Sequence, residues 1–113
     1  MPVKGVILMV KKLKMSREEA ERRLGDVPWE KQFYCNDGRV LKNLAELEVA
    51  FRDTSDDIFR NHFNEEKNDF YNWVAEVIGD DKLSLDLLRI KNKDQAANKV
   101  AERIAWLKSI LVT

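Results

Sequence analysis

Helix N-cap residues recur along the chain, and their spacing predicts a fold built mainly from helices. Ser16 and Glu19 form a capping box, in which the serine hydroxyl accepts the Glu19 amide and the glutamate reaches back. Asn43 and Glu46 form a second one, and the other candidate caps are Thr54 or Ser55, Asn68, Asp80 or Asp81, and Asn92. The predicted helices span residues 17–24, 44–52, 55–63, 69–78, from 80 or 81 to about 90, and 93–111, with Gly25 and Gly79 as stops.

Apolar residues at helical spacing predict the buried face of each helix. In helix 69–78 the face contains Phe70, Trp73, Val74 and Val77, and in helix 93–111 it contains Ala97, Val100, Ile104, Leu107 and Leu111. The corresponding residues elsewhere are Leu44, Leu47 and Phe51, and then Leu83, Leu87, Leu88 and Ile90. These faces are enough for one hydrophobic core.

Two short segments favour extended structure. Asp37-Gly38 lies between the apolar residues of 32–35 and 39–41, which is typical of a tight hairpin. Residues 3–10 are rich in β-branched side chains and are expected to form a strand or an extended arm within 1–15. The predicted fold class is therefore mainly α, a compact bundle of five to six helices with a small N-terminal β-hairpin or strand. A chain of 113 residues fits a single domain, 1–113.

The charges balance overall but are unevenly distributed. Residues 1–23 carry seven basic and three acidic side chains, and residues 87–113 carry six and two. Residues 44–86 carry four basic and twelve acidic side chains. Because opposite charges favour compaction, we expect the two basic ends to fold back against the acidic middle.

A single cysteine, Cys35, is typical of a protein from a reducing compartment. The apolar run at residues 6–10 is too short for a signal sequence or a membrane span. We therefore expect a cytoplasmic protein with no membrane association.

The sequence predicts no catalytic residues, no metal site and no cofactor. One Cys and one His, Cys35 and His62, cannot supply the three or four ligands of a typical zinc site. Cys35 is expected in the core, and the acidic pairs are expected to cap helices. Residues 54–81 have roughly the outline of a helix-turn-helix, but they carry two basic and eight acidic side chains, which disfavours binding in a DNA groove.

The last helix carries a candidate partner-binding surface. Trp106 falls opposite the buried face of helix 93–111, and beside it are Lys99, Arg103 and Ile110. An aromatic ring flanked by cations can stack on a nucleic-acid base, on a lipid interface or on a partner's aromatic group. The alternative is that residues 6–10 of the same chain pack over Trp106.

The polar junction, formed by His62, Asn64, Asn68 and Asp69, lies between two predicted helices. Asparagine suits both the end of one helix and the start of the next. His62 can bond a neighbouring carbonyl or carboxylate. The junction therefore either fixes the turn or recognises a ligand.

Residues 30–90 resemble a family of small archaeal proteins that carry a domain of unknown function. The specific part of the resemblance is the motif His62-x-Asn64-Glu65-x-Lys67-Asn68-Asp69-Phe70-x-x-Trp73. The resemblance implies an archaeal, cytoplasmic, mostly helical domain. It carries over no activity, cofactor or catalytic residue.

The sequence favours a non-catalytic helical module that binds a protein partner, and a homodimer is a further option. One alternative is a nucleic-acid- or ribosome-associated protein that uses its basic N- and C-terminal segments. These carry Lys11, Lys12, Lys14, Arg22, Arg23, Lys91, Lys93, Lys99, Arg103 and Lys108. The other alternative is an enzyme or ligand-binding site around His62 and Asp69.

Overall fold

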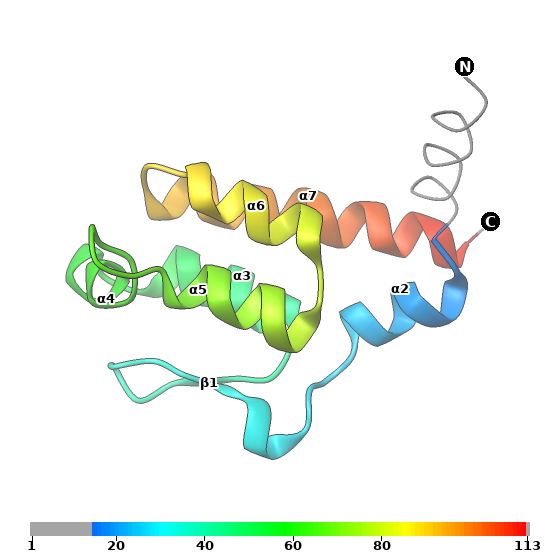
Figure 1. Cartoon of the computed structure of the whole chain (residues 1–113), viewed down its shortest axis with the longest axis horizontal. Helices are drawn as coiled ribbons and strands as arrows, with labels where there is room; N and C mark the ends of the chain where they lie inside the picture. Colours follow the sequence, from blue (N-terminus) through cyan, green and yellow to red (C-terminus); the bar gives the residue numbers. More distant parts are fainter. Residues whose placement is uncertain (1–14, 113) are drawn as a thin grey trace.

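The computed structural model describes residues 15–112, which form a mainly helical fold with one two-stranded antiparallel sheet, as predicted (Figure 1). The predicted strand or arm at residues 3–10 lies outside the described residues. The elements are α2 (Arg17–Leu24), η1 (Trp29–Lys31), β1 (Phe33–Tyr34), β2 (Val40–Leu41), α3 (Leu44–Asp53), α4 (Asp56–His62), α5 (Asp69–Trp73), η2 (Val74–Ile78), α6 (Asp81–Arg89) and α7 (Lys93–Leu111).

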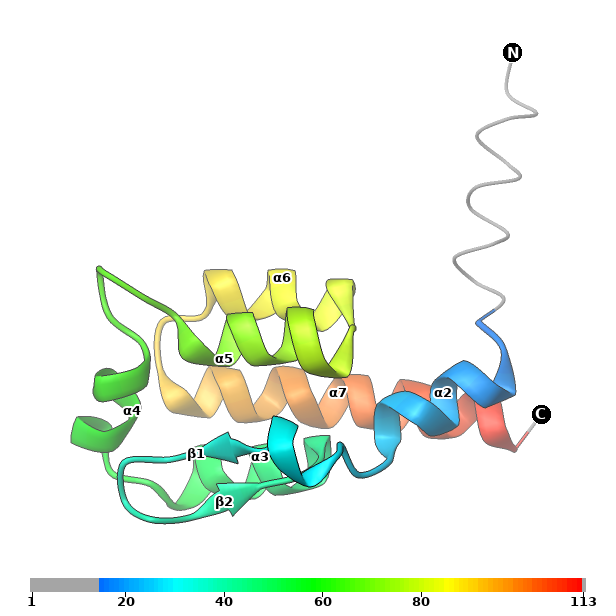
Figure 2. The ribbon, with the colours of Figure 1, turned by 60° about the horizontal axis from the view of Figure 1, so that its bottom comes forward.

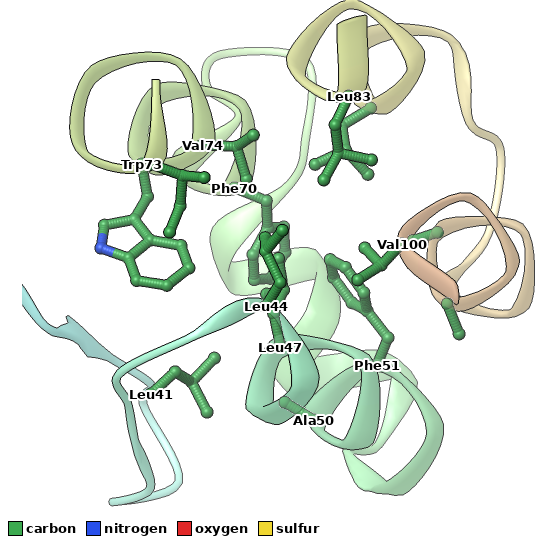
Figure 3. Close-up of a cluster of buried hydrophobic side chains, with 14 of the residues drawn as sticks. Leu41, Leu44, Leu47, Ala50, Phe51, Phe70, Trp73, Val74, Leu83 and Val100 are labelled. Carbon is green, nitrogen blue, oxygen red and sulfur yellow. The ribbon is translucent and has the colours of Figure 1, made fainter. Parts of the chain in front are cut away.

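The long helix α7 organises the domain, because α2, α3 and α6 all pack against it. In Figure 2, α2 lies against the C-terminal part of α7, while α5 and α6 lie side by side above it. Side chains from α3, α5, η2, α6 and α7 meet in one core (Figure 3). Four of its fully buried members are Leu44, Leu47, Leu83 and Val100.

Six side chains cap helices as the sequence predicts, and the structure selects one residue where two were candidates. Ser55, and not Thr54, caps α4, because its hydroxyl accepts the Ile58 amide at 3.2 Å. Asp80, and not Asp81, caps α6 through the Leu83 amide at 2.8 Å. The other caps are Ser16, Asn43, Asn68 and Asn92.

In each predicted capping box the glutamate was expected to reach back to the start of its helix, but both glutamates bind other groups. The Glu19 carboxylate binds the guanidinium groups of Arg22 and Arg23, and the Glu46 carboxylate accepts the Lys42 amide at 2.9 Å. For Glu19 the physical reason is charge, since a guanidinium binds a carboxylate more strongly than a neutral amide does.

The predicted helix 69–78 consists of α5 and a π-helical turn, η2. A π turn contains more residues than an α turn and rotates the side chains that follow it. Ile78 is therefore fully buried, whereas Val77 is only partly buried. Gly79 ends the turn with a left-handed φ of 76°.

Leu88 was predicted to point inward, but it is 48% exposed. Leu83 and Leu87 are four residues apart and share the buried face of α6, whereas Leu88 is rotated a further 100° around the helix. Ile90, predicted near the end of this helix, is its C-cap residue and is buried. On α7 the predicted buried residues are confirmed except Leu111, which is partly buried.

The predicted hairpin is confirmed, with Phe33 opposite Leu41 and Tyr34 opposite Val40. Phe33 and Leu41 face the core, while Tyr34 and Val40 face outward. The indole N–H of Trp73 donates to the Lys31 carbonyl at 2.8 Å, which ties η1 to α5.

Candidate functional site

His62 lies at the end of α4, and both of its ring nitrogens are used inside the domain. Nε2 accepts the Asn36 amide at 3.1 Å, and Nδ1 lies 2.9 Å from Oδ2 of Asp69. Because Nε2 accepts, the proton of the neutral ring is on Nδ1 and is donated to Asp69. The ring packs against both Phe33 and Phe70, and the residue is 5% exposed.

Asp69 is the anionic member of the polar junction. Burial acts to raise its pKa, but hydrogen bonds from His62 and Lys67 outweigh this effect and hold the pKa below its usual value. The Lys67 ammonium lies 3.1 Å from the same carboxylate oxygen that faces His62. The structure thus brings His62 and Asp69 together, as the sequence suggested.

The two asparagines of the polar junction bond elsewhere. Asn64 donates to the Arg60 carbonyl at the end of α4 and accepts the Glu66 amide. Asn68 caps α5 and donates from its amide nitrogen to the Leu87 carbonyl at 3.0 Å. Each member of the junction therefore has a structural bond, and the junction connects the hairpin, α4, α5 and α6.

A cluster of charged side chains around buried Asp80, which sequence reasoning missed, joins α2, α6 and α7. Asp80 is fully buried and accepts Nε of Arg103 at 2.8 Å and Nη1 of Arg23 at 3.1 Å. Glu19 extends this Asp80 cluster, because it binds both Arg22 and Arg23. Hydrogen bonds first from Arg22 and then from Arg23 lower the pKa of Glu19 to about 2.

No local pattern identifies Asp80 as buried, because its two arginine partners are 57 and 23 positions away. The sequence shows only an acidic helix cap. The one available signal is its position between two apolar residues, Ile78 and Leu83, of neighbouring helical segments.

A groove of about 1060 Å³ lies beside the Asp80 cluster, between α2, α6 and α7. We call it the α7 groove. Its lining consists of Met15, Ser16, Glu19, Arg23, Asp81, Lys82, Leu85, Asp86, Lys99, Glu102, Arg103 and Trp106. Its apolar side chains are Met15, Leu85, which is 55% exposed, and Trp106.

Of the four predicted partner-binding residues, the structure places three in the lining of the α7 groove and leaves one outside it. Trp106 and Lys99 line the α7 groove, and Trp106 is partly buried against the core. Ile110 is also partly buried against the core but is absent from the lining. Arg103 stacks on Trp106, with its guanidinium carbon 4.3 Å from the ring centroid, and its side chain is only 12% exposed because it binds Asp80.

The charges around the α7 groove balance in number. Four acidic and four basic side chains line it, and buried Asp80 lies behind it. Arg23 and Arg103 bind Asp80, Lys82 pairs with Asp86, and Lys99 pairs with Glu102. Asp81 forms no ion pair with any residue from 15 to 112, so its carboxylate is available to a ligand.

A second hollow, of about 540 Å³, lies between α4 and the α6–α7 connection. Phe59 and Phe63 stack beside it, and its other lining residues include three basic and two acidic side chains. Lys93 donates to the Thr54 carbonyl and thus ties the two sides together. This hollow has half the volume of the α7 groove and a mixed charge.

The remaining candidate chemistry is limited in the described part of the chain. Burial, with a smaller contribution from the Asp37 charge, raises the pKa of the Cys35 thiol to about 11. No three His, Cys, Asp or Glu side chains between residues 15 and 112 are placed to hold a metal ion. No helix in that range is long and apolar enough to cross a membrane.

Comparison of the chain with protein-family models, curated proteins and solved structures gave no match. The resemblance of residues 30–90 to an archaeal family therefore stays a prediction. The functional argument rests on the geometry of the α7 groove.

Proposed function

We propose that this domain is a non-catalytic protein-interaction module whose α7 groove binds an apolar peptide segment flanked by basic residues. The observation that carries the proposal is the combination of Leu85 and Trp106 in one groove. Water-exposed apolar surface gathered in a concave site is typical of peptide and protein binding. The arginine stacked on Trp106 holds the ring in place for a partner.

The carboxylate of Asp81 at the rim supports the choice of a basic partner. Asp81 has no ion-pair partner among residues 15–112, whereas Asp86 and Glu102 already pair with Lys82 and Lys99. A lysine or arginine next to an apolar segment would reach Asp81. Charge pairs at the rim contribute more to orientation and association rate than to affinity.

The basic segments offer weaker support for nucleic-acid binding. Arg22, Arg23 and Arg103 all bind carboxylates within the Asp80 cluster. Lysine and arginine bind nucleic acid by neutralising phosphates, and internally paired residues contribute less to such binding. This pairing favours a protein partner.

The polar junction likewise offers weaker support for an enzyme. A general base needs a ring nitrogen within reach of substrate, but Nδ1 and Nε2 of His62 both bond inside the domain. Its 5% exposure leaves little surface for a substrate. These contacts favour a structural role for His62.

Site-specific photo-crosslinking tests the proposal. A benzophenone amino acid replaces Leu85 in the groove, and in a control chain it replaces Val49, which is 53% exposed on α3. We expect a discrete protein adduct from position 85 and none from position 49. Arg103 is unsuitable as a test position because its replacement removes a partner of Asp80.

A charge-reversal variant tests the predicted chemistry of the partner. Asp81→Lys keeps the Asp80 cap and changes only an exposed residue. The position-85 adduct should fall several-fold in this variant, while Asp94→Lys, an exposed change outside the groove, should leave it unchanged. Equal adducts from positions 85 and 49 would contradict the proposal.

A further inference from the structure

The polypeptide enters the described structure at the α7 groove. Met15 and Ser16, the residues that lead into α2, both line the groove. The fourteen residues that precede Met15 are thus joined directly to its rim. A segment tethered at a binding site has a high effective concentration there.

The chemistry of residues 1–14 matches the groove. Residues 6–10 read Val-Ile-Leu-Met-Val, a continuous apolar run. Lysines at positions 4, 11, 12 and 14 flank it, and residues 1–14 contain no acidic side chain. An apolar run with basic flanks suits a groove that presents Leu85 and Trp106 and carries the carboxylate of Asp81 at its rim.

The length of the connection is also sufficient. From residue 10 to Met15 there are five residue steps, which span up to about 17 Å when extended. Met15 and Leu85 line the same groove, so a tether of this length can bring residue 10 from the start of α2 toward Leu85 on α6. It is too short to carry residue 10 far from the groove, which favours docking in the same molecule.

We infer that residues 6–10 of the same chain occupy the α7 groove, with aliphatic side chains against Leu85 and Trp106 and the following lysines beside Asp81. The inference rests on the proposed function, since it uses the same recognition of an apolar segment with basic flanks. It makes the N-terminal segment an intramolecular competitor of any external partner.

Paramagnetic relaxation in the full-length chain tests this docking. Cys35→Ser removes the natural thiol, and Lys11→Cys carries a nitroxide next to the apolar run without altering it. We expect strong broadening of the Trp106 indole signal and the Leu85 amide. The amides of Tyr34 and Val40, on the outer face of the hairpin, should stay sharp.

A matched labelled chain with Ile7→Asp and Leu8→Asp provides the control. The same nitroxide remains attached, but the apolar run is interrupted by charge, so the groove signals should sharpen. Groove signals as sharp as those of the hairpin in the chain with the intact run would overturn the inference. Equal broadening in both chains would also overturn it, because the apolar run would then be irrelevant.

These results separate the two proposals. If the segment competes with a partner, the Leu85 photo-adduct should increase several-fold in the Ile7→Asp, Leu8→Asp chain. An adduct together with sharp groove signals would leave the proposed function standing and remove the intramolecular docking. Broadened groove signals with no adduct from either chain would support the docking and contradict external partner binding.

Discussion

Nε2 of His62 accepts the backbone N–H of Asn36 at 3.1 Å, and this bond fastens the turn of the hairpin to the end of α4. The two residues are 26 positions apart. Through Nδ1 the same ring binds Asp69 at the start of α5. One buried imidazole thus connects three segments while its ring packs against Phe33 and Phe70.

Replacing this ring should destabilise the domain without affecting the α7 groove. His62→Ala removes the acceptor of the Asn36 amide and leaves a cavity beside two phenylalanine rings. The expected loss in the free energy of unfolding is about 2–4 kcal/mol, from the cavity and the lost hydrogen bonds. Urea denaturation measures it, and hydrogen exchange should show faster exchange of the Asn36 amide.

Asn61→Ala is the matched control, because Asn61 is the exposed neighbour of His62 in α4. It should change stability by less than about 0.5 kcal/mol. If His62→Ala had an equally small effect, the contacts of the ring would contribute no stability, and a ligand-binding role would regain support.

Among the charged residues of the domain, Asp80 should be the one whose substitution lowers the free energy of unfolding most. Asp80→Asn keeps the shape of the side chain and a residue type that caps helices well. It removes the negative charge between Arg23 and Arg103. Breaking a buried pair in this way costs about 3–5 kcal/mol in unfolding free energy.

Asp81→Asn, at the exposed adjacent position, serves as the control for Asp80→Asn in the same urea titrations. A loss below about 1 kcal/mol for Asp80→Asn would mean that both arginines reach water when the charge is removed.

The helix starts were predictable because their causes are local. Asn68 accepts the Tyr71 amide three residues later, so the sequence alone contains both partners. The hairpin is local in the same sense, since Gly38, with a φ of 95°, supplies the turn. Buried helical faces follow from spacing within one helix, as for Val100 and Leu107.

The Asp80 cluster and the α7 groove depend on contacts between distant segments. Arg23 and Arg103 reach Asp80 only after α2 and α6 have packed on α7. Spacing on α7 placed Trp106 opposite the buried face, whereas the structure packs it partly buried against the core. Spacing could not show that α2 and α6 form a groove around it. The π turn is similarly invisible, and it decides that Ile78 is more deeply buried than Val77.

Acid should weaken the domain partly through Glu19. The folded pKa, about 2, lies below the ordinary value of 4.5, so the charged form stabilises the fold. That contribution is full above about pH 4.5 and is lost as pH falls toward 2. Because the side chain is about one third exposed, the contribution should be below about 1 kcal/mol.

Urea denaturation of the native chain and of Glu19→Gln, at pH 6 and pH 3, measures this contribution. The difference in unfolding free energy between the two chains should shrink at pH 3. A constant difference would show that the carboxylate charge of Glu19 is not responsible. Asp69, whose pKa is also lowered, should add to the acid sensitivity of both chains equally.

Cys35 should react slowly in the folded domain. Burial raises the thiol pKa from 9.0 to about 11, and the thiolate is the reactive form. At pH 8 this shift lowers the thiolate fraction, and therefore the alkylation rate, by about 100-fold. Iodoacetamide labelling followed by mass spectrometry, with and without urea, measures the ratio, and equal rates would show that the thiol is accessible.

Gly79 and Gly38 offer a direct comparison of two left-handed glycines. Both have positive φ, 76° and 95°, so an alanine is strained at either position by about 1–2 kcal/mol. A Cβ at residue 38 would meet nothing within 4 Å, whereas at residue 79 it would lie 3.1 Å from Nη2 of Arg22. That same nitrogen donates to the Ile78 carbonyl at 2.9 Å and binds Glu19.

Gly79→Ala should therefore cost more unfolding free energy than Gly38→Ala, because it also displaces the Arg22 guanidinium. In the double variant with Arg22→Ala, where the guanidinium is absent, the added cost of Gly79→Ala should fall toward that of Gly38→Ala. Urea denaturation of these chains in a double-mutant cycle isolates the contact. An unchanged cost of Gly79→Ala without Arg22 would show that backbone strain alone determines the effect.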